Sequence, residues 1–348
     1  MSVVEKGVRM KRKFIRGVIV FGCVMVLVSG LLGTAFGQSA KPVSWGYSPC
    51  SPGSKGSSYY NYTWGPIADI IGKDTQGRLK LTVHEALVPD PRVIEGVRDG
   101  TVDMGTQIVF YRGELAPLNF VALPFIPREK LPEIVKQMRS SFTQFVSEKS
   151  DVVMLGYGYW ARQRLITKTP VRTLADLQGY KLRVHNPETL GLMKAAGASP
   201  VFMPMSEVYP AFQRGVINGG VTSLEGVMGN KWYEQLKYVN NWPMGNGSYI
   251  WIANKKSWAA LPADLQKQIL QLFQEKYEMA TFTGGLKDDA EQQAKLEAMG
   301  VTFVDPDPKE VEKYLANVPP ILGEWKKRVG PSADELIGAV NKVLGTKY

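Results

Sequence analysis

Residues 170–186 read PVRTLADLQGYKLRVHN and contain the pattern on which the fold prediction depends. Near the end of this stretch, Leu182 and Val184 alternate with Lys181 and Arg183, and alternation with a period of two is typical of a β-strand. An Asn-Pro pair that can start a helix follows at once. We therefore expect Arg183 to stand at the end of a strand and face a cleft, where its planar guanidinium suits a carboxylate.

Short strands alternate with helices along most of the chain, which predicts an α/β architecture. This alternation predicts parallel strands. In a parallel sheet the connecting loops collect at one edge, where such proteins bind ligands. The expected strands are residues 43–47, 79–84, 102–106, 164–167, 181–184, 200–203, 216–221 and 249–254, with helices at 59–75 and 91–98.

The longest helical pattern runs from about residue 263 to 299, with apolar residues at spacings of three and four. Pro262 precedes it and Gly300 follows it, as at the two ends of a helix. At 1.5 Å per residue it would span about 55 Å, more than one lobe needs. We therefore predict a helix shared by two lobes, with a break or kink at Gly284 and Gly285.

The N-terminus has the layout of a secretory signal peptide. Basic residues at 11–13 precede an apolar run at 17–32, and Ala35 and Gly37 provide the small residues of a cleavage site. We expect residues 1–37 to be a signal peptide cut after Gly37. An uncleaved membrane anchor is the alternative, because the apolar run is near the short end of the transmembrane range.

Charge and composition exclude several classes of function. The whole chain carries a net charge of +10, but without residues 1–37 it has 36 Lys and Arg against 31 Asp and Glu, a net charge of +5. This modest excess has no dense basic cluster, so nucleic acid is not an expected partner, whereas an anionic solute is. Cys50 is then the single cysteine, and the two histidines, His84 and His185, have no metal-ligand spacing.

Motifs for catalysis are also missing from the sequence. Residues 53–56 lack the order of a phosphate-binding loop, and no nucleophile elbow is present. We therefore expect no enzyme, no catalytic residues, no metal and no cofactor.

Five segments, in order, resemble the DctP-type solute receptors of TRAP (tripartite ATP-independent periplasmic) transporters. Residues 170–184 resemble the family's stretch P-hydrophobic-x-T-x-x-D-L-x-G-x-K-x-R-V, and residues 197–209 resemble its GA-x-P and M-x-x-SE-V-Y segment. Residues 97–104, 213–219 and 261–266 are similar to its R-x-G-x-x-D signature, to its Gly-Val-Val-Asp-Gly segment and to the start of its long helix. The resemblance extends from about residue 42 to 345.

This resemblance implies a two-lobed periplasmic solute-binding (flytrap) fold that closes on a small organic acid. It implies delivery of the acid to the small and large subunits of a TRAP membrane permease, with uptake driven by ion gradients. We expect a periplasmic protein, and a monomer rather than a dimer. The alternatives are a binding protein of another carrier class, such as an ABC importer or a sensor, or a secreted enzyme acting on a carboxylated substrate. The expected lobes are residues 38–160 with 249–288, and residues 161–248 with 289–348.

The resemblance also assigns site residues. Arg183 matches the arginine that forms a salt bridge with the ligand carboxylate, and Asn186 lies where a neighbouring side chain often reaches the ligand. A second arginine is expected just after the aromatic strand ending near Trp160; Arg162 and Arg164 both fit and would share one face of an extended segment, and we slightly favour Arg162.

The sequence departs from the family at Thr222, which keeps a hydroxyl where the family has the amide of an Asn, and at its tyrosine-rich entry segment. The tyrosines there either pack against a lobe or line the pocket. The candidate ligand-binding residues are Arg183, Arg162, Arg164, Asn186, Thr222, Trp160, Met205, Gln107, Asp90, Tyr59 and Tyr60.

Overall fold

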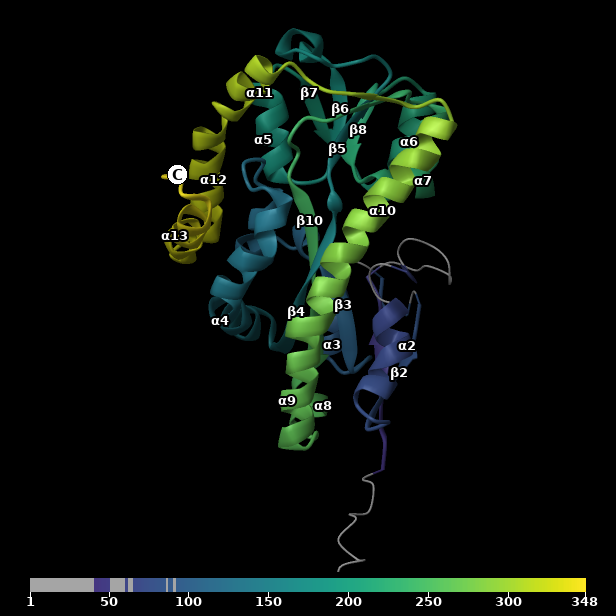
Figure 1. The fold of residues 1–348 in the computed structure, drawn as a ribbon, viewed down its shortest axis with the longest axis vertical. Helices are drawn as coiled ribbons and strands as arrows, with labels where there is room; N and C mark the ends of the chain where they lie inside the picture. Colours follow the sequence, from purple (N-terminus) through teal and green to yellow (C-terminus); the bar gives the residue numbers. More distant parts are fainter. Residues whose placement is uncertain (1–40, 51–59, 62–64, 86, 90–91) are drawn as a thin grey trace, which may run out of the picture. The chain divides into compact units, whose positions relative to one another are not determined.

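Two β-sheets carry the fold in the computed structural model, which describes residues 41–50, 60–61, 65–85, 87–89 and 92–348. The first sheet has the strand order β2-β1-β3-β10-β4 (Figure 1). The second has the order β11-β9-β5-β8-β6-β7. The strands of the first sheet are β1 Val43–Ser48, β2 Leu79–Val83, β3 Met104–Ile108, β4 Val152–Arg162 and β10 Asn246–Asn254. Those of the second are β5 Arg164–Thr167, β6 Lys181–Val184, β7 Ser199–Phe202, β8 Gly219–Thr222, β9 Tyr238–Asn240 and β11 Thr302–Val304.

The sheets are mixed, although parallel strands were predicted. β1 is parallel to β2 and β3, and β6 is parallel to β7 and β8, as expected. The prediction is wrong for β10, which is antiparallel to β3 and β4, and for β5, which is antiparallel to β8 and β9. The physical reason is that the chain crosses from the first sheet to the second where β4 continues into β5, and returns where β9 leads into β10. The two crossings run in opposite directions, so β10 is antiparallel to β4 and β5 is antiparallel to β9.

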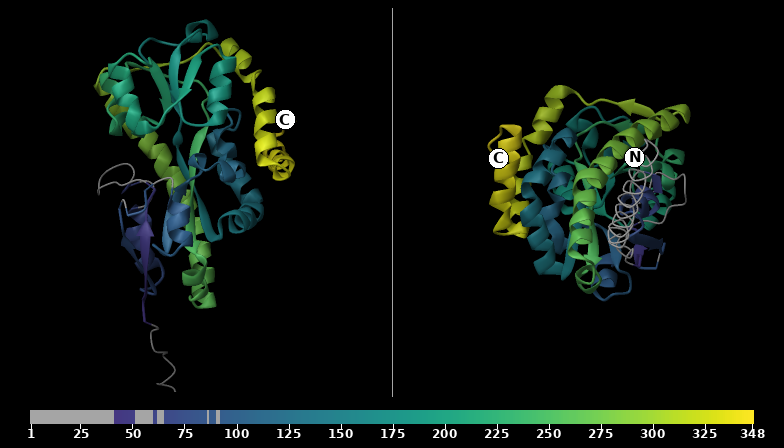
Figure 2. Two further views of the ribbon diagram at one scale, coloured as in Figure 1. Left: turned by 180° about the vertical axis from the view of Figure 1, so that it is seen from behind. Right: turned by 60° about the horizontal axis from the view of Figure 1, so that its bottom comes forward.

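Helices cover the sheets. α4 packs on β4 and is itself contacted by α13, and α12 contacts both α5 and the 3-10 segment η3 (Figure 2). The helices are α2 Gly65–Asp74, α3 Val93–Arg98, α4 Leu131–Ser150, α5 Pro187–Ala195, α6 Met205–Gln213, α7 Leu224–Gly229, α8 Lys255–Ala259, α11 Pro308–Leu315, α12 Val318–Val329 and α13 Ser332–Leu344. The 3-10 segments are η2 Val109–Tyr111, η3 Gly113–Ala122, η4 Arg128–Lys130, η5 Leu174–Leu177 and η6 Trp232–Glu234.

The predicted long helix is present and contacts elements of both sheets. It consists of α9 Ala263–Gln271, a π-helical segment η7 Leu272–Tyr277 and α10 Glu278–Ala298. α10 contacts β4 in the first sheet and β11 in the second. The predicted break at Gly284 and Gly285 is wrong, because α10 continues through both. Gly285 serves close packing instead: a β-carbon there would lie 2.5 Å from Nη2 of Arg128.

Residues 43–348 form one compact unit. One hydrophobic cluster lies mainly around the first sheet and a second around the strands β5 and β9 with α6 and α7. The largest cluster extends from α3 and α4 to α12 and α13 and includes residues of both sheets. Of the described helices, none is both long and apolar enough to cross a membrane.

Candidate ligand-binding site

Arg183 lies at the centre of three parallel strands, where β6 is flanked by β7 and β8. Its side chain is buried, with 2% of the residue exposed. Nε donates to the carbonyl oxygen of Met203 at 3.0 Å, and Nη1 donates to that of Val221 at 2.9 Å. Val221 belongs to β8 and Met203 directly follows β7, so backbone on either side of β6 fixes the orientation of the guanidinium before any ligand arrives.

The two residues that follow β6 are committed to local structure. Asn186 caps α5, because its Oδ1 accepts from the backbone N–H of Thr189 at 2.8 Å. Its Nδ2 lies 3.2 Å from Nε2 of His185. Since an amide nitrogen only donates, Nε2 of His185 accepts, and the proton of the neutral imidazole is on Nδ1. Burial, and then the adjacent charge of Arg183, lower the pKa of His185 to about 3, so the ring is neutral at physiological pH.

His185 also joins the two sheets. Its ring meets the edge of Phe110 with centroids 4.8 Å apart, and Phe110 belongs to η2, directly after β3 of the first sheet. Nearby, Nδ2 of Asn119 donates to Oε2 of Glu188 in the first turn of α5 at 3.4 Å. The ends of β3 and β6 therefore face each other across the region where the ligand was predicted.

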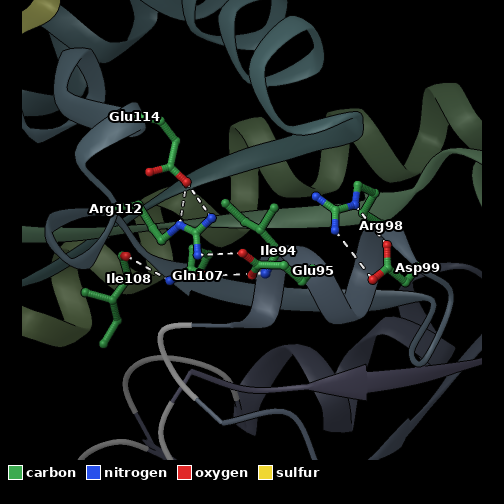
Figure 3. A network of polar contacts seen from close by, with 8 residues as sticks. All are labelled: Ile94, Glu95, Arg98, Asp99, Gln107, Ile108, Arg112 and Glu114. Atoms are coloured by element: carbon green, nitrogen blue, oxygen red, sulfur yellow. Dashed lines mark hydrogen bonds and ion pairs between the residues drawn. The ribbon is translucent and has the colours of Figure 1, made fainter.

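The candidates from the first sheet have structural partners. Figure 3 shows Gln107 between two backbone groups: its Oε1 accepts from the N–H of Ile94 at 3.2 Å, and its Nε2 donates to the carbonyl of Ile108 at 3.0 Å. Gln107 thus ties α3 to β3. Tyr60 is half-buried and donates its hydroxyl proton to Asp69, and this hydrogen bond raises the pKa of Tyr60 to about 12. Tyr59 and Asp90 lie outside the described residues.

Trp160 is connected to the second sheet's helices. Its indole Nε1 donates to Oε2 of Glu225 in α7 at 3.1 Å, and the residue is 7% exposed. Burial raises the pKa of Glu225 well above its usual value, and the neighbouring Asp288 adds to the shift. This shift favours the neutral form of the carboxyl group beside the indole ring.

A β-bulge in β4 determines which side chains lie next to Trp160. Tyr159 pairs with Ser248 and Arg162 with Asn246, so β4 has one residue more than β10 between these two pairs. A β-carbon at Gly247 would lie 2.9 Å from Cβ of Trp160 and 3.5 Å from Nε2 of Gln163.

Gln163 is 6% exposed and lies near Trp160 at this bulge, and its Nε2 donates to the carbonyl oxygen of Ala161 at 3.1 Å; the sequence analysis did not select it. Alternation alone gave no reason to do so, because a bulge is visible only in the pairing of two strands.

Arg162 and Arg164 share one face, as predicted, because both reach Oδ2 of Asp289. Nη2 of Arg164 lies 2.8 Å from it and Nη2 of Arg162 lies 3.9 Å from it. Arg164 is buried and also donates to Oδ1 of Asn241 at 2.6 Å. Burial lowers the pKa of Arg164. The guanidinium of Arg164 thus anchors α10, whereas the side chain of Arg162 is 48% exposed and lines a separate cavity.

The remaining candidates lie in β8 and α6. Thr222 is 5% exposed and pairs with Arg164 across the β5–β8 ladder. Its Oγ1 lies against the backbone of Gly226, where a β-carbon would be only 2.4 Å away. Met205 begins α6 and is half-buried. The structure thus brings Thr222 into the strand that anchors Arg183.

Known proteins match this arrangement over most of the chain. The family described as "bacterial extracellular solute-binding protein, family 7", DctP, matches residues 53–328. The chain belongs to this family. A solute-binding protein of Roseobacter denitrificans is 30% identical to this DctP-family chain over 242 residues, which cover 67% of this chain and 73% of that protein. The C4-dicarboxylate-binding periplasmic protein DctP of Rhodobacter capsulatus is 25% identical over 299 residues, covering 84% of this chain and 87% of the relative.

Solved structures agree with the fold. DctP7 of Bordetella pertussis, an extracytoplasmic solute receptor binding pyroglutamic acid, superimposes with a TM-score of 0.75 at 25% identity and covers 86% of this chain and 99% of its own. A TRAP periplasmic solute-binding protein of Desulfovibrio salexigens has a TM-score of 0.76 at 20% identity, with coverages of 87% and 98%. The resemblance to DctP-type TRAP receptors and the two-lobed α/β fold class are therefore confirmed.

Proposed function

We propose that this DctP-family receptor binds a small organic acid between its two sheets, with the acid's carboxylate on Arg183. The observation that carries the proposal is the anchoring of a buried guanidinium by the carbonyls of Met203 and Val221. Because two bonds already fix the fork, little side-chain entropy is lost when a carboxylate pairs with it.

The relatives support the chemical class. One is named for C4-dicarboxylates and the DctP7 structure is described with pyroglutamic acid, and both ligands carry a carboxylate. The rest of the ligand is expected to meet Thr222, Gln163 and the buried carboxyl of Glu225, which accepts from Trp160 and whose raised pKa favours its neutral form. None of these groups carries the positive charge that a second arginine would supply. They therefore favour a neutral polar group, not a second carboxylate, at that end of the acid.

Binding is proposed to close two lobes about a hinge. The lobes are those expected from the sequence, residues 38–160 with 249–288 and residues 161–248 with 289–348, and the hinge lies where β4 passes into β5 and β9 into β10. Contacts such as Phe110 on His185 and Trp160 on Glu225 join elements of the two sheets. A ligand that prefers the closed form shifts the population toward it.

The closed receptor is proposed to deliver the acid to the small and large subunits of a TRAP permease. This function requires export, and we propose that residues 1–37 are removed on the way to the periplasm. N-terminal sequencing of the protein exported by a bacterial host is expected to begin at Gln38. A membrane-bound product that retains Met1 would contradict the cleavage.

Calorimetry tests the role of Arg183. A thermal-shift screen of organic acids against the mature protein first identifies a ligand, because binding raises the apparent stability. Arg183→Ala is then expected to weaken that ligand by about 100-fold or more, since a paired charge is lost from a buried site. The exposed Arg214→Ala is the matched control and should bind normally.

Unchanged affinity in Arg183→Ala would reject the proposal. Stoichiometric binding without product distinguishes a receptor from an enzyme in the same samples.

A further inference from the structure

A second site is suggested by a cavity at the crossings between the two sheets. Its volume is about 280 Å³. Its walls include Arg162 at the end of β4, residues 241–246 leading into β10, and Phe282 and Leu286 of α10. In Figure 1, β4, β10 and α10 run past one another in the middle of the fold. The cavity walls therefore come from three segments that pass between the sheets.

Two arginines give this cavity a basic end. Arg128 is 7% exposed; it donates from Nη1 to the carbonyl of Trp160, and from Nη2 to that of Phe282 at 3.5 Å, while its Nε is buried without an acceptor. Burial lowers the pKa of Arg128 to about 10, which leaves it cationic at neutral pH, and the charge of Arg162 contributes in the same direction. The two guanidiniums thus act on each other at one cavity.

Asn246 adds a buried polar group to the same end. It pairs with Arg162 in the β4–β10 ladder, so the two side chains project from the same face. The residue is 5% exposed, and its Oδ1 is buried without a hydrogen-bond partner. That oxygen needs a donor, which water can supply and an ionised carboxylate cannot. The buried Nε–H of Arg128, a donor without an acceptor, is the group that matches a carboxylate.

The carboxylates nearby offset this charge only in part: the charge of Asp289 raises the pKa of Arg128, against the effect of burial. Asp289 is 3.9 Å from Arg162 but only 2.8 Å from Arg164, with which it forms its closer ion pair. Glu129 lines the cavity and is exposed to solvent, where water screens its charge. The three positive charges of Arg128, Arg162 and Arg164 therefore exceed the two negative charges of Asp289 and Glu129, and water screens the charge of Glu129.

Apolar side chains line much of the rest of the cavity. Trp242, Met244, Phe282 and Leu286 line it. Trp242 and Met244 are buried, whereas Leu286 is 43% exposed at the rim. A cavity with an apolar wall and a basic end suits a small amphipathic anion, because each part of such a ligand finds its own environment.

We propose that this cavity binds a small monocarboxylate with an apolar body, at a hinge site separate from the Arg183 site. None of Arg183, Asn186 and Thr222 lines it. Its walls belong to segments that must move when the lobes close, so a ligand there has different affinities for the open and closed forms and changes binding at Arg183. This coupling rests on the proposed function; the site itself does not.

Crystals of the mature Arg183→Ala protein soaked with 4-bromobenzoate locate the site, because the bromine gives an anomalous signal and the cleft arginine is absent. We expect the bromine against Trp242 and Phe282 with the carboxylate toward Arg162. Anomalous density elsewhere, or none, would overturn the site.

Calorimetry with benzoate then tests the charge requirement in solution, again in the Arg183→Ala protein. Adding Arg162→Ala is expected to weaken benzoate at least tenfold, and Leu286→Glu should do the same by placing a negative charge at the rim. Both positions are at least partly exposed, so the fold should tolerate the changes. Arg214→Ala is the control cation and benzamide is the neutral control ligand. Equal binding of benzoate and benzamide, or no effect of Arg162→Ala, would reject an anion site.

Coupling is measured in the protein with Arg183 intact. Benzoate at saturation is expected to change the affinity for the cleft acid by about fivefold or more. An unchanged affinity would reject the coupling. If instead Arg183→Ala still binds the cleft acid normally, the proposed function fails while the benzoate result stands, so the two failures are distinguishable.

Discussion

Nη1 of Arg183 donates to the carbonyl oxygen of Val221 at 2.9 Å, which ties a side chain of β6 to the backbone of the neighbouring parallel strand β8. Val221 directly precedes Thr222, where the sequence departs from the family's usual residue. The anchor of the carboxylate partner and the altered position therefore lie side by side in one strand. The orientation of the Arg183 guanidinium is fixed by the backbone, and the side chain of Thr222 lies next to the carbonyl that fixes it.

Arg183→Lys separates charge from geometry. A lysine keeps the positive charge but cannot hold two carbonyls and a carboxylate with one planar fork. We expect roughly tenfold weaker binding of the native acid than in the wild type, measured by calorimetry, with Arg183→Ala weaker still. Wild-type affinity in Arg183→Lys would show that charge alone is sufficient.

His185 makes stability depend on pH. Its pKa is about 3 in the folded protein and about 6.5 in an unfolded chain. Above about pH 6.5 both states are neutral and the residue has no effect. Between about pH 6.5 and 3 the unfolded chain binds a proton that the folded protein does not. The free energy of unfolding therefore decreases by up to about 1.4 kcal/mol for each unit by which the pH is lowered.

Denaturant unfolding at several pH values measures this slope. His185→Gln should reduce it, whereas His84→Gln, at the other histidine, should leave it unchanged. The same slope in wild type and His185→Gln would contradict the assignment.

Asp289 is expected to stabilise the attachment of α10 to β5. Asp289→Ala leaves Arg164 buried without its carboxylate, which should cost roughly 3 kcal/mol in the free energy of unfolding. Denaturant unfolding measures the loss. Lys287→Ala, at an exposed position of the same helix, is the control and should leave the midpoint unchanged. A midpoint for Asp289→Ala equal to that of the control would show that the ion pair contributes little.

Two glycines within helices should respond in opposite directions to alanine. At Gly285 a β-carbon would lie 2.5 Å from Nη2 of Arg128, which is itself bonded to two carbonyls, so Gly285→Ala should lower the free energy of unfolding by about 1–3 kcal/mol. At Gly323 of α12 nothing lies within 4 Å, and Gly323→Ala should raise it by about 0.5–1 kcal/mol. Thermal unfolding of both variants checks the signs, and stabilisation by Gly285→Ala would refute the packing argument.

Local patterns predicted much of the fold. The strands at 164–167 and 181–184 agree with β5 and β6 to the residue. Polar and apolar side chains alternate in 181–184, whereas 164–167 has two adjacent apolar residues, Leu165 and Ile166. The strand expected at 102–106 is instead Met104–Ile108, since Val102 and Asp103 belong to the turn after α3. The long helix was predicted from its period, but its irregular segment lies at 272–277, not at the glycines.

The candidate site was predicted less completely. Arg183 and Asn186 could be selected from one strand and the helix start after it. The position of Gln163 near Trp160 could not be predicted, because the bulge there arises from pairing with β10. Sequence alternation also could not separate Arg162 from Arg164. They differ in burial and in distance to Asp289, which lies more than a hundred residues away in the chain.

By itself, the sequence determined the α/β class, the family, the shared long helix and the position of Arg183, since these depend on local periodicity and on motifs within short segments. Only the tertiary structure decided the direction of β5 and β10, the two carbonyls that hold Arg183, and the partners of Arg164, Gln107 and Trp160. These depend on which strands and helices meet across the fold, and residues distant in the chain interact only once the chain has folded.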